Sequence, residues 1–190
     1  QTWVIDRAIT QANVVLGNLG PPRKNPDFFP IAVMNYILGG GGFSSRLLTE
    51  VRAKRGFAYS VSSAFDFKKF SGSFSVSFQT KNDSAREAIS IVLEEMKKIQ
   101  TEPVTDKELE GARKYLTGSF PLRLDTQAKL AGFLAQVEFY DLGYDYADTY
   151  TSRIMAVTKE DIQRVAKKYL NPDNHTLVVV GNLKEAGFKE

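Results

Sequence analysis

Two neighbouring segments near the middle of the chain alternate apolar and polar residues. Between positions 73 and 78, Phe74, Val76 and Phe78 alternate strictly with serines. The preceding segment, 57–67, also alternates, with Tyr59, Val61 and Phe65 on one side. The pattern predicts a β-hairpin with one apolar face and one hydroxyl-rich face. We expect the apolar face to pack on helices and the serine face to meet water or a ligand.

The region after the hairpin has helical spacing of its apolar residues. Capping residues are present at Thr105, with Glu108 three positions later, and at Thr158, followed by Asp161. Helices are therefore predicted at 84–99, 105–119, 126–140, 144–155 and 158–169. We expect the first two of these helices to cover the apolar face of the hairpin.

The ends of the chain add further strands and helices. The apolar run 11–17 predicts a strand, and Asp27 is positioned to cap a helix that ends in the glycine run 39–42. A second helix begins at Ser44 or Ser45 and ends at Gly56, and a buried strand follows at 176–180. This order predicts an α+β fold, an antiparallel-rich mixed sheet with helices packed on one face. The length of 190 residues fits a single domain spanning 1–190.

Charge and residue counts exclude several classes of function. The net charge of +3 is too small to indicate nucleic acid or an anionic membrane as partner, and the sequence contains no apolar run long enough to span a membrane. The sequence has no cysteine, which is compatible with either bacterial cytoplasm or periplasm. His175 is the only histidine, so the chain cannot form the two-histidine zinc motif of a metallopeptidase.

The first residues, Gln1, Thr2 and Trp3, include neither an initiator methionine nor the hydrophobic region of a signal peptide. We interpret this start as a cut within a longer polypeptide or as a processed end.

Several familiar motifs are incomplete in this sequence. The run Gly39, Gly40, Gly41 and Gly42 lacks the lysine of a phosphate-binding loop, which favours a connection between helices or a mobile loop that touches substrate. Serine catalysis would depend on His175, for which no partner is recognisable. The tyrosines at 140, 144, 146 and 150 have mostly helical spacing, which favours packing over a ligand site.

Arg52 and Tyr59 form the strongest candidate pair. Arg52 lies in the last turn of a predicted helix, Gly56 breaks the helix, and Tyr59 begins the next strand. Such a corner can bring together the N–H fork of arginine and the O–H of tyrosine, which could hold a peptide carbonyl or an oxyanion. The alternative is that both residues have structural roles. Arg52 would stabilise the C-terminal end of the helix dipole, and Tyr59, which shares the alternation of Val61, would be buried in the core.

The sequence resembles the insulinase-type, or pitrilysin-type, zinc peptidases, which include the mitochondrial processing peptidases. The resemblance covers about residues 2–185 and depends on the order and spacing of short motifs. These are Gln11–Ala12, Gly17 and Gly20, Asn35–Gly40, Phe43–Leu47, Glu50–Arg52, Arg55–Val61 and Val178–Gly181.

The resemblance implies a clam shell of paired homologous domains, of which this chain is the half without zinc. It implies that Arg52 and Tyr59 reach the substrate backbone beside the zinc of the partner domain or subunit. It also implies that Gly39, Gly40, Gly41 and Gly42 contact a peptide or protein substrate. The serine face of Ser73, Ser75 and Ser77 would line the chamber. The chain itself would hold no metal and would be inactive alone.

Two other functions stay open at this point. The chain is a catalytically inert structural subunit, as some members of the family are, or it is a stand-alone peptide-binding module. Loss of the arginine or the tyrosine would favour an inert homologue, and both residues are present.

Overall fold

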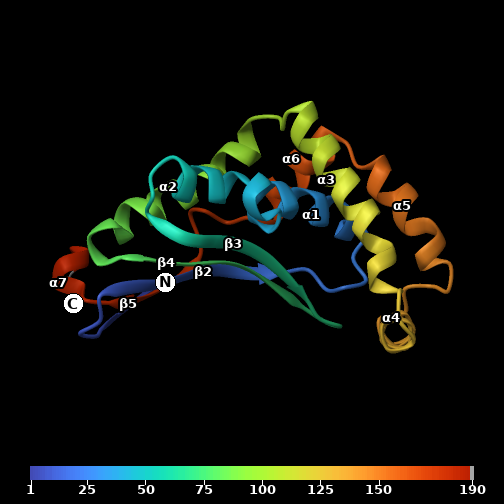
Figure 1. Ribbon diagram of the computed structural model, residues 1–190, viewed down its shortest axis with the longest axis horizontal. Helices are drawn as coiled ribbons and strands as arrows, with labels where there is room; N and C mark the ends of the chain where they lie inside the picture. The colour runs from blue at the N-terminus through green and yellow to red at the C-terminus, as the bar shows by residue number, and fades with distance from the viewer. Residues whose placement is uncertain (189–190) are drawn as a thin grey trace.

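A five-stranded sheet forms one layer of the molecule. The computed structural model describes residues 1–188, and its strands are β1 (Thr2–Asp6), β2 (Gln11–Gly20), β3 (Ala58–Phe67), β4 (Gly72–Lys81) and β5 (Thr176–Gly181). Their order across the sheet is β1-β5-β2-β4-β3. Only the β1–β5 pair is parallel among these four pairings. The helices lie on one face of the sheet (Figure 1), so the α+β prediction is confirmed.

The two faces of β4 divide as the alternating pattern predicts. Phe74, Val76 and Phe78 are buried. Ser73 and Ser77 are exposed on the opposite face, and Ser75 is half-buried there. The face away from the helices is therefore hydroxyl-rich along this strand.

The open face of the sheet changes character from one edge to the other. One row runs across all five strands, from Trp3 through Val178 and Val15 to Ser77 and Ser62. Trp3 is 60% exposed and Val15 is 47% exposed. Along this row the β1–β5–β2 side is apolar, and the β4–β3 side carries small hydroxyl side chains.

Helices of the first half begin after the proline-rich loop. The segment α1 (Phe28–Asn35) continues into a wide π-type turn over Tyr36–Gly40, so the helix ends inside the glycine run. Short helical turns follow at Gly42–Ser44 and Leu48–Ala53, where the sequence predicts one longer helix.

The remaining helices agree with the predicted positions to within a few residues. They are α2 (Ala85–Thr101), α3 (Asp106–Ser119), α4 (Gln127–Phe139), α5 (Tyr146–Ala156) and α6 (Lys159–Tyr169). A short α7 (Leu183–Ala186) follows β5 and was not predicted. Reciprocal capping boxes begin α3 at Thr105 and α6 at Thr158, as predicted. None of the helices within residues 1–188 is long and apolar enough to cross a membrane.

Tertiary packing corrects three of the sequence-based expectations. Helix α2 packs on β2 and β4, but α3 packs chiefly on α1 and α5, in an outer layer, instead of covering the hairpin. Helix α4 buries only Val137, and Leu130 and Leu134 of its predicted apolar stripe are largely exposed. Strand β1 was not predicted, because its residues lack a strict alternation and its parallel pairing with β5 joins the two ends of the chain.

Asp27 links helices α1 and α6 instead of capping α1. Its side chain forms no cap hydrogen bond and is buried. The carboxylate accepts hydrogen bonds from Arg164 at 2.7 Å, Lys168 at 2.9 Å and the hydroxyl of Tyr169 at 2.7 Å. Burial alone would raise the pKa of Asp27, but these three donors outweigh it and lower the pKa to about 2. The ionised carboxylate therefore helps fix the start of α1.

Candidate functional site

A tight corner joins the turn of helix at Leu48–Ala53 to β3 and carries Arg52. Gly56 has a positive φ of 66°, and its N–H donates to the carbonyl of Arg52 at 2.8 Å. The N–H of Phe57 donates to the carbonyl of Val51 at 3.0 Å. A glycine at this position accepts the left-handed backbone that ends the helix, as the sequence predicts. The corner directs the chain straight into the edge strand.

Tyr59 is exposed because β3 has an irregularity at its start. Ala58 pairs with Thr80 and Val61 pairs with Phe78, so Tyr59 and Ser60 together oppose the single residue Gln79. Such a bulge reverses the alternation locally. Tyr59 is 84% exposed, whereas Val61 is buried. The shared register that would bury Tyr59 beside Val61 is therefore absent.

The glycine run is partly a packing device. Gly39 is buried, and a Cβ atom there would lie 2.5 Å from the Ser63 hydroxyl and 2.6 Å from its backbone nitrogen. The close approach of the helix to Ser63 is stabilised by Asn35, whose side-chain oxygen accepts a 2.8 Å hydrogen bond from the Ser63 hydroxyl. Gly42, by contrast, is exposed, has a φ of 56° and faces open space. The first glycine lets the helix approach β3, and the last one turns the chain outwards.

That outward turn brings Phe43 to the Arg52–Tyr59 corner. The guanidinium carbon of Arg52 lies 4.9 Å from the ring centre of Phe43 and 4.9 Å from that of Tyr59. Phe43 is 81% exposed. Arg52 is thus held by two exposed aromatic rings, an arrangement that leaves the N–H edge of its planar group available. Phe43 was missed as a site residue, and its only signal was an aromatic side chain directly after four glycines.

Arg52 is the cation of this corner that forms no ion pair within residues 1–188. Glu50 forms ion pairs with Lys54 at 2.6 Å and with Arg55 at 2.8 Å. The hydrogen bond from Lys54, followed by that from Arg55, lowers the pKa of Glu50. None of the ion pairs within residues 1–188 includes Arg52. Its positive charge is therefore available to an anion or a carbonyl oxygen.

The predicted serine face begins beside this corner, at Ser77 of β4, and runs along β4 towards the hairpin turn. Ser77 pairs with Ser62 and Ser75 pairs with Ala64, on the two strands that carry the bulge. Ser73 pairs with Asp66 further along, beside the hairpin turn. The side chains along this surface are small.

The donor groups of residues 1–188 do not fit a metal centre. Residues 1–188 contain no cluster of three or more His, Cys, Asp or Glu side chains able to hold an ion. His175 lies in the turn before β5, where its Nδ1 atom is 2.9 Å from the carbonyl oxygen of Pro172. Ser44 and Ser45 donate to the carbonyls of Gly41 and Gly42. These contacts pair neither Ser44 nor Ser45 with His175, so the structure does not support a serine–histidine catalytic pair.

Comparison with known proteins identifies relatives over nearly the whole chain. An uncharacterized zinc protease of Streptomyces coelicolor is 33% identical over 182 residues, which are 96% of this chain and 39% of that protein. The non-peptidase homolog YmxG of Helicobacter pylori is 29% identical over 153 residues, 80% of this chain and 35% of that protein. The crystal structure of a peptidase M16 inactive domain from Pseudomonas fluorescens has a TM-score of 0.89 and 31% identity, and covers 95% of this chain and 43% of that one.

The chain thus spans between 35% and 43% of the length of these relatives. A family model described as the peptidase M16 inactive domain matches residues 2–116, more than half of the chain. The predicted resemblance to insulinase-type zinc peptidases is confirmed, and this protein belongs to the peptidase M16 inactive-domain family.

Proposed function

We propose that this chain is the substrate-binding, non-catalytic half of a zinc metalloendopeptidase. It pairs with a homologous zinc-bearing domain or subunit, and its Arg52 and Tyr59 side chains extend towards a peptide bound between the two. Zinc belongs to that partner in the proposal, because the donor groups of residues 1–188 do not form a metal site. This chain's own role is to bind and orient the peptide.

The observation that carries the proposal is the contact of the Arg52 guanidinium with both the Phe43 and the Tyr59 rings. Both rings are more than four-fifths exposed, at 81% and 84%, although aromatic side chains usually contribute to a core. A guanidinium held at 4.9 Å from each ring is restrained before any ligand arrives. Such preorganisation reduces the entropy lost when the donor group meets its acceptor.

The chemistry of the pair suits a peptide bond under attack. Arg52 can donate from a planar fork, and Tyr59 can donate from its hydroxyl. These donors act on the peptide carbonyl and on the negative charge that develops on its oxygen. Gly40 and Gly42, which are exposed, supply backbone close to this position, and Ser75 and Ser77 hold extended peptide along the open face.

The test uses the complete peptidase, assembled from this chain and its zinc-bearing partner. Tyr59→Phe keeps the aromatic ring and its contact with Arg52 but removes the O–H group. We expect kcat to fall by about 10²-fold with a smaller change in KM, since the loss of one oxyanion donor costs about 10²–10³-fold. Arg52→Lys keeps the charge and loses the planar fork, and it should also lower kcat.

Matched controls are available in the same molecule. Tyr144 is 86% exposed, and Tyr144→Phe removes an equivalent hydroxyl from a different surface. Arg55→Lys changes an exposed arginine that pairs with Glu50. Both controls should retain full kcat. Unchanged kcat in Tyr59→Phe would exclude the catalytic contribution.

A second function, that of an inert scaffold, is favoured by one relative. The Helicobacter pylori protein is named a non-peptidase homolog, and its similarity covers 80% of this chain. If this chain is also inert, no assembly that contains it will cleave peptide, and the Tyr59 and Arg52 variants will have no activity to lose. Peptide cleavage by the assembled wild-type protein separates the two functions directly.

A further inference from the structure

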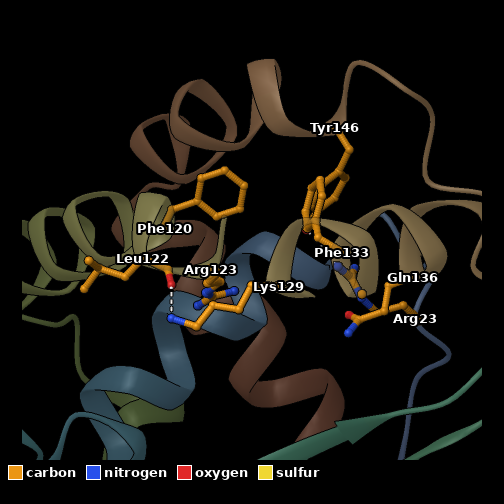
Figure 2. A pocket seen from close by; sticks show the side chains of 9 residues that line it. Arg23, Phe120, Leu122, Arg123, Lys129, Phe133, Gln136 and Tyr146 are labelled. Atoms are coloured by element: carbon orange, nitrogen blue, oxygen red, sulfur yellow. Dashed lines mark hydrogen bonds between the residues drawn. The ribbon is translucent and has the colours of Figure 1, made fainter. Parts of the chain in front are cut away.

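A cavity of about 460 Å³ lies at the other end of the molecule, where α4 and α5 meet the loop before α1. Figure 2 shows Phe120 and Leu122 on one side of it, Phe133 and Tyr146 on the other, and Arg123 and Lys129 between them.

The walls of the cavity are aromatic. The rings of Phe120 and Phe133 have centres 5.9 Å apart in an edge-to-face arrangement, and the ring of Phe133 lies 6.1 Å from that of Tyr146. Behind them, Phe120 stacks on the buried Tyr150 at 4.0 Å. The buried stack makes these walls rigid. Phe120 and Tyr146 are themselves buried, so the apolar surface open to a ligand is that of the half-buried Phe133 and the exposed Leu122.

The charged groups of the cavity are all positive. It contains Arg23, Arg123 and Lys129 and no carboxylate. No ion pair within the described residues involves Arg23 or Arg123. Lys129 pairs with Asp125 at 2.8 Å, but both side chains are about half exposed, so water screens this attraction.

Each arginine lies near an aromatic ring, which leaves part of its N–H edge for a ligand. The guanidinium carbon of Arg23 lies 3.6 Å from the ring centre of Phe28, and one of its nitrogens donates to the Tyr146 hydroxyl at 2.8 Å. The guanidinium of Arg123 lies 5.9 Å from the ring of Phe120. A guanidinium has five N–H donors in its plane, so stacking on a ring does not consume them.

We propose that this cavity binds an organic anion, namely a carboxylate or phosphate group attached to a flat apolar body. Arg123 and Lys129 hold the anionic group, and Arg23 contributes to the positive field from the opposite wall. The apolar body packs against the half-buried Phe133 and the exposed Leu122. The charge excludes cations, and the aromatic walls give an aromatic anion an advantage over an inorganic one.

This site is separate from the Arg52–Tyr59 corner. Lys69, in the turn after β3, lies 4.6 Å from the ring centre of Phe139 on α4, which places α4 beside the hairpin tip (Figure 1). Tyr59 stands at the opposite end of β3, roughly 25 Å away along the strand at about 3.3 Å per residue. Loss of one site therefore leaves the other intact.

The test measures binding of four small probes to the full 190-residue chain by titration calorimetry. We expect phenyl phosphate and 3-phenylpropionate to bind saturably, inorganic phosphate to bind more weakly, and phenethylamine not to bind. Comparison of the first two probes shows which anionic group the cavity prefers. Equal affinity for phenethylamine, or no saturable binding of either aromatic anion, would overturn the proposal.

Variants locate the site. Arg123→Gln and Lys129→Gln should each weaken phenyl phosphate binding by about tenfold, the size expected for one lost charge-assisted hydrogen bond. Arg86→Gln is the matched control, because Arg86 also stacks on a ring, that of Phe188, but lies outside the cavity. Unchanged affinity in both cavity variants, or an equal loss in the control, would refute this location.

Discussion

The buried carboxylate of Asp27 makes a quantitative prediction about stability and pH. It is almost fully buried, at 6% exposure, and accepts hydrogen bonds from Arg164, Lys168 and Tyr169 of α6. Asp27→Asn preserves the size of the side chain and removes its negative charge. The three donors then lose their charged acceptor, and the connection between α1 and α6 weakens.

The magnitude follows from the pKa of Asp27. It falls from an ordinary 3.8 to about 2 in the folded protein. Since one pKa unit corresponds to about 1.36 kcal/mol, the ionised carboxylate contributes about 2 kcal/mol to the free energy of unfolding near neutral pH. We expect Asp27→Asn to lose about that amount there, a large change relative to the usual total stability of a domain.

The sign of the pH dependence follows from the same shift. A carboxyl group whose pKa is lowered by folding binds protons more readily in the unfolded chain. Its contribution to the free energy of unfolding is therefore complete at pH values above the pKa of the unfolded state. The contribution disappears as the pH falls from about 4 to about 2. Because a protonated Asp and an Asn have similar shape, the stability curves of wild type and variant should converge at the acid end.

Urea unfolding followed by circular dichroism, from about pH 7 to about pH 2, measures both curves. The control is Asp106→Asn, which removes an exposed carboxylate paired with Lys159. Water screens an exposed pair of this kind, so its loss should change the stability little. The reasoning fails if the Asp27 variant differs from wild type by a constant amount across the whole pH range, or if the two variants behave alike.

Three further predictions concern the site and its support. Phe43→Ala should mobilise the Arg52 side chain, seen as sharpened Nε–Hε NMR signals, and change stability by less than about 1 kcal/mol because the contact is exposed. Gly39→Ala should destabilise the fold by about 1–3 kcal/mol, because the added methyl group would overpack against β3. Gly111→Ala, in open space on α3, should stabilise the fold by about 0.5–1 kcal/mol, and thermal melts of the two variants test both expectations. Metal analysis of the purified chain should find no stoichiometric zinc, since His175 is its only histidine, and tight binding at one ion per chain would contradict this.

Local patterns in the sequence determined the face of the hairpin and the starts of its best-capped helices. The strict alternation of Phe74, Val76 and Phe78 with serines leaves one arrangement in which the apolar side chains avoid water. Thr105 and Thr158 satisfy free N–H groups within three residues of themselves, so no distant contact is needed. These features depend only on neighbours in the chain.

Other features depend on contacts between distant segments. Asp27 is bound by α6, more than 130 residues away, instead of capping its own helix. The parallel pairing of β1 with β5 depends on the meeting of the two ends of the chain. The apolar side chains of α4 have helical spacing, but they are exposed because neighbouring elements leave that side uncovered.

The candidate site combines both kinds of information. Family motifs in the sequence identified Arg52 and Tyr59, and Gly56 predicted the corner between them. The sequence could not place Tyr59 outside the core, because a bulge that sets two residues against Gln79 is a property of the pairing between strands. Nor could it place Phe43 on Arg52, since that contact requires Gly39 to pack against β3 and Gly42 to turn outwards. Short-range spacing therefore specified which residues to examine, and long-range packing decided which of them meet.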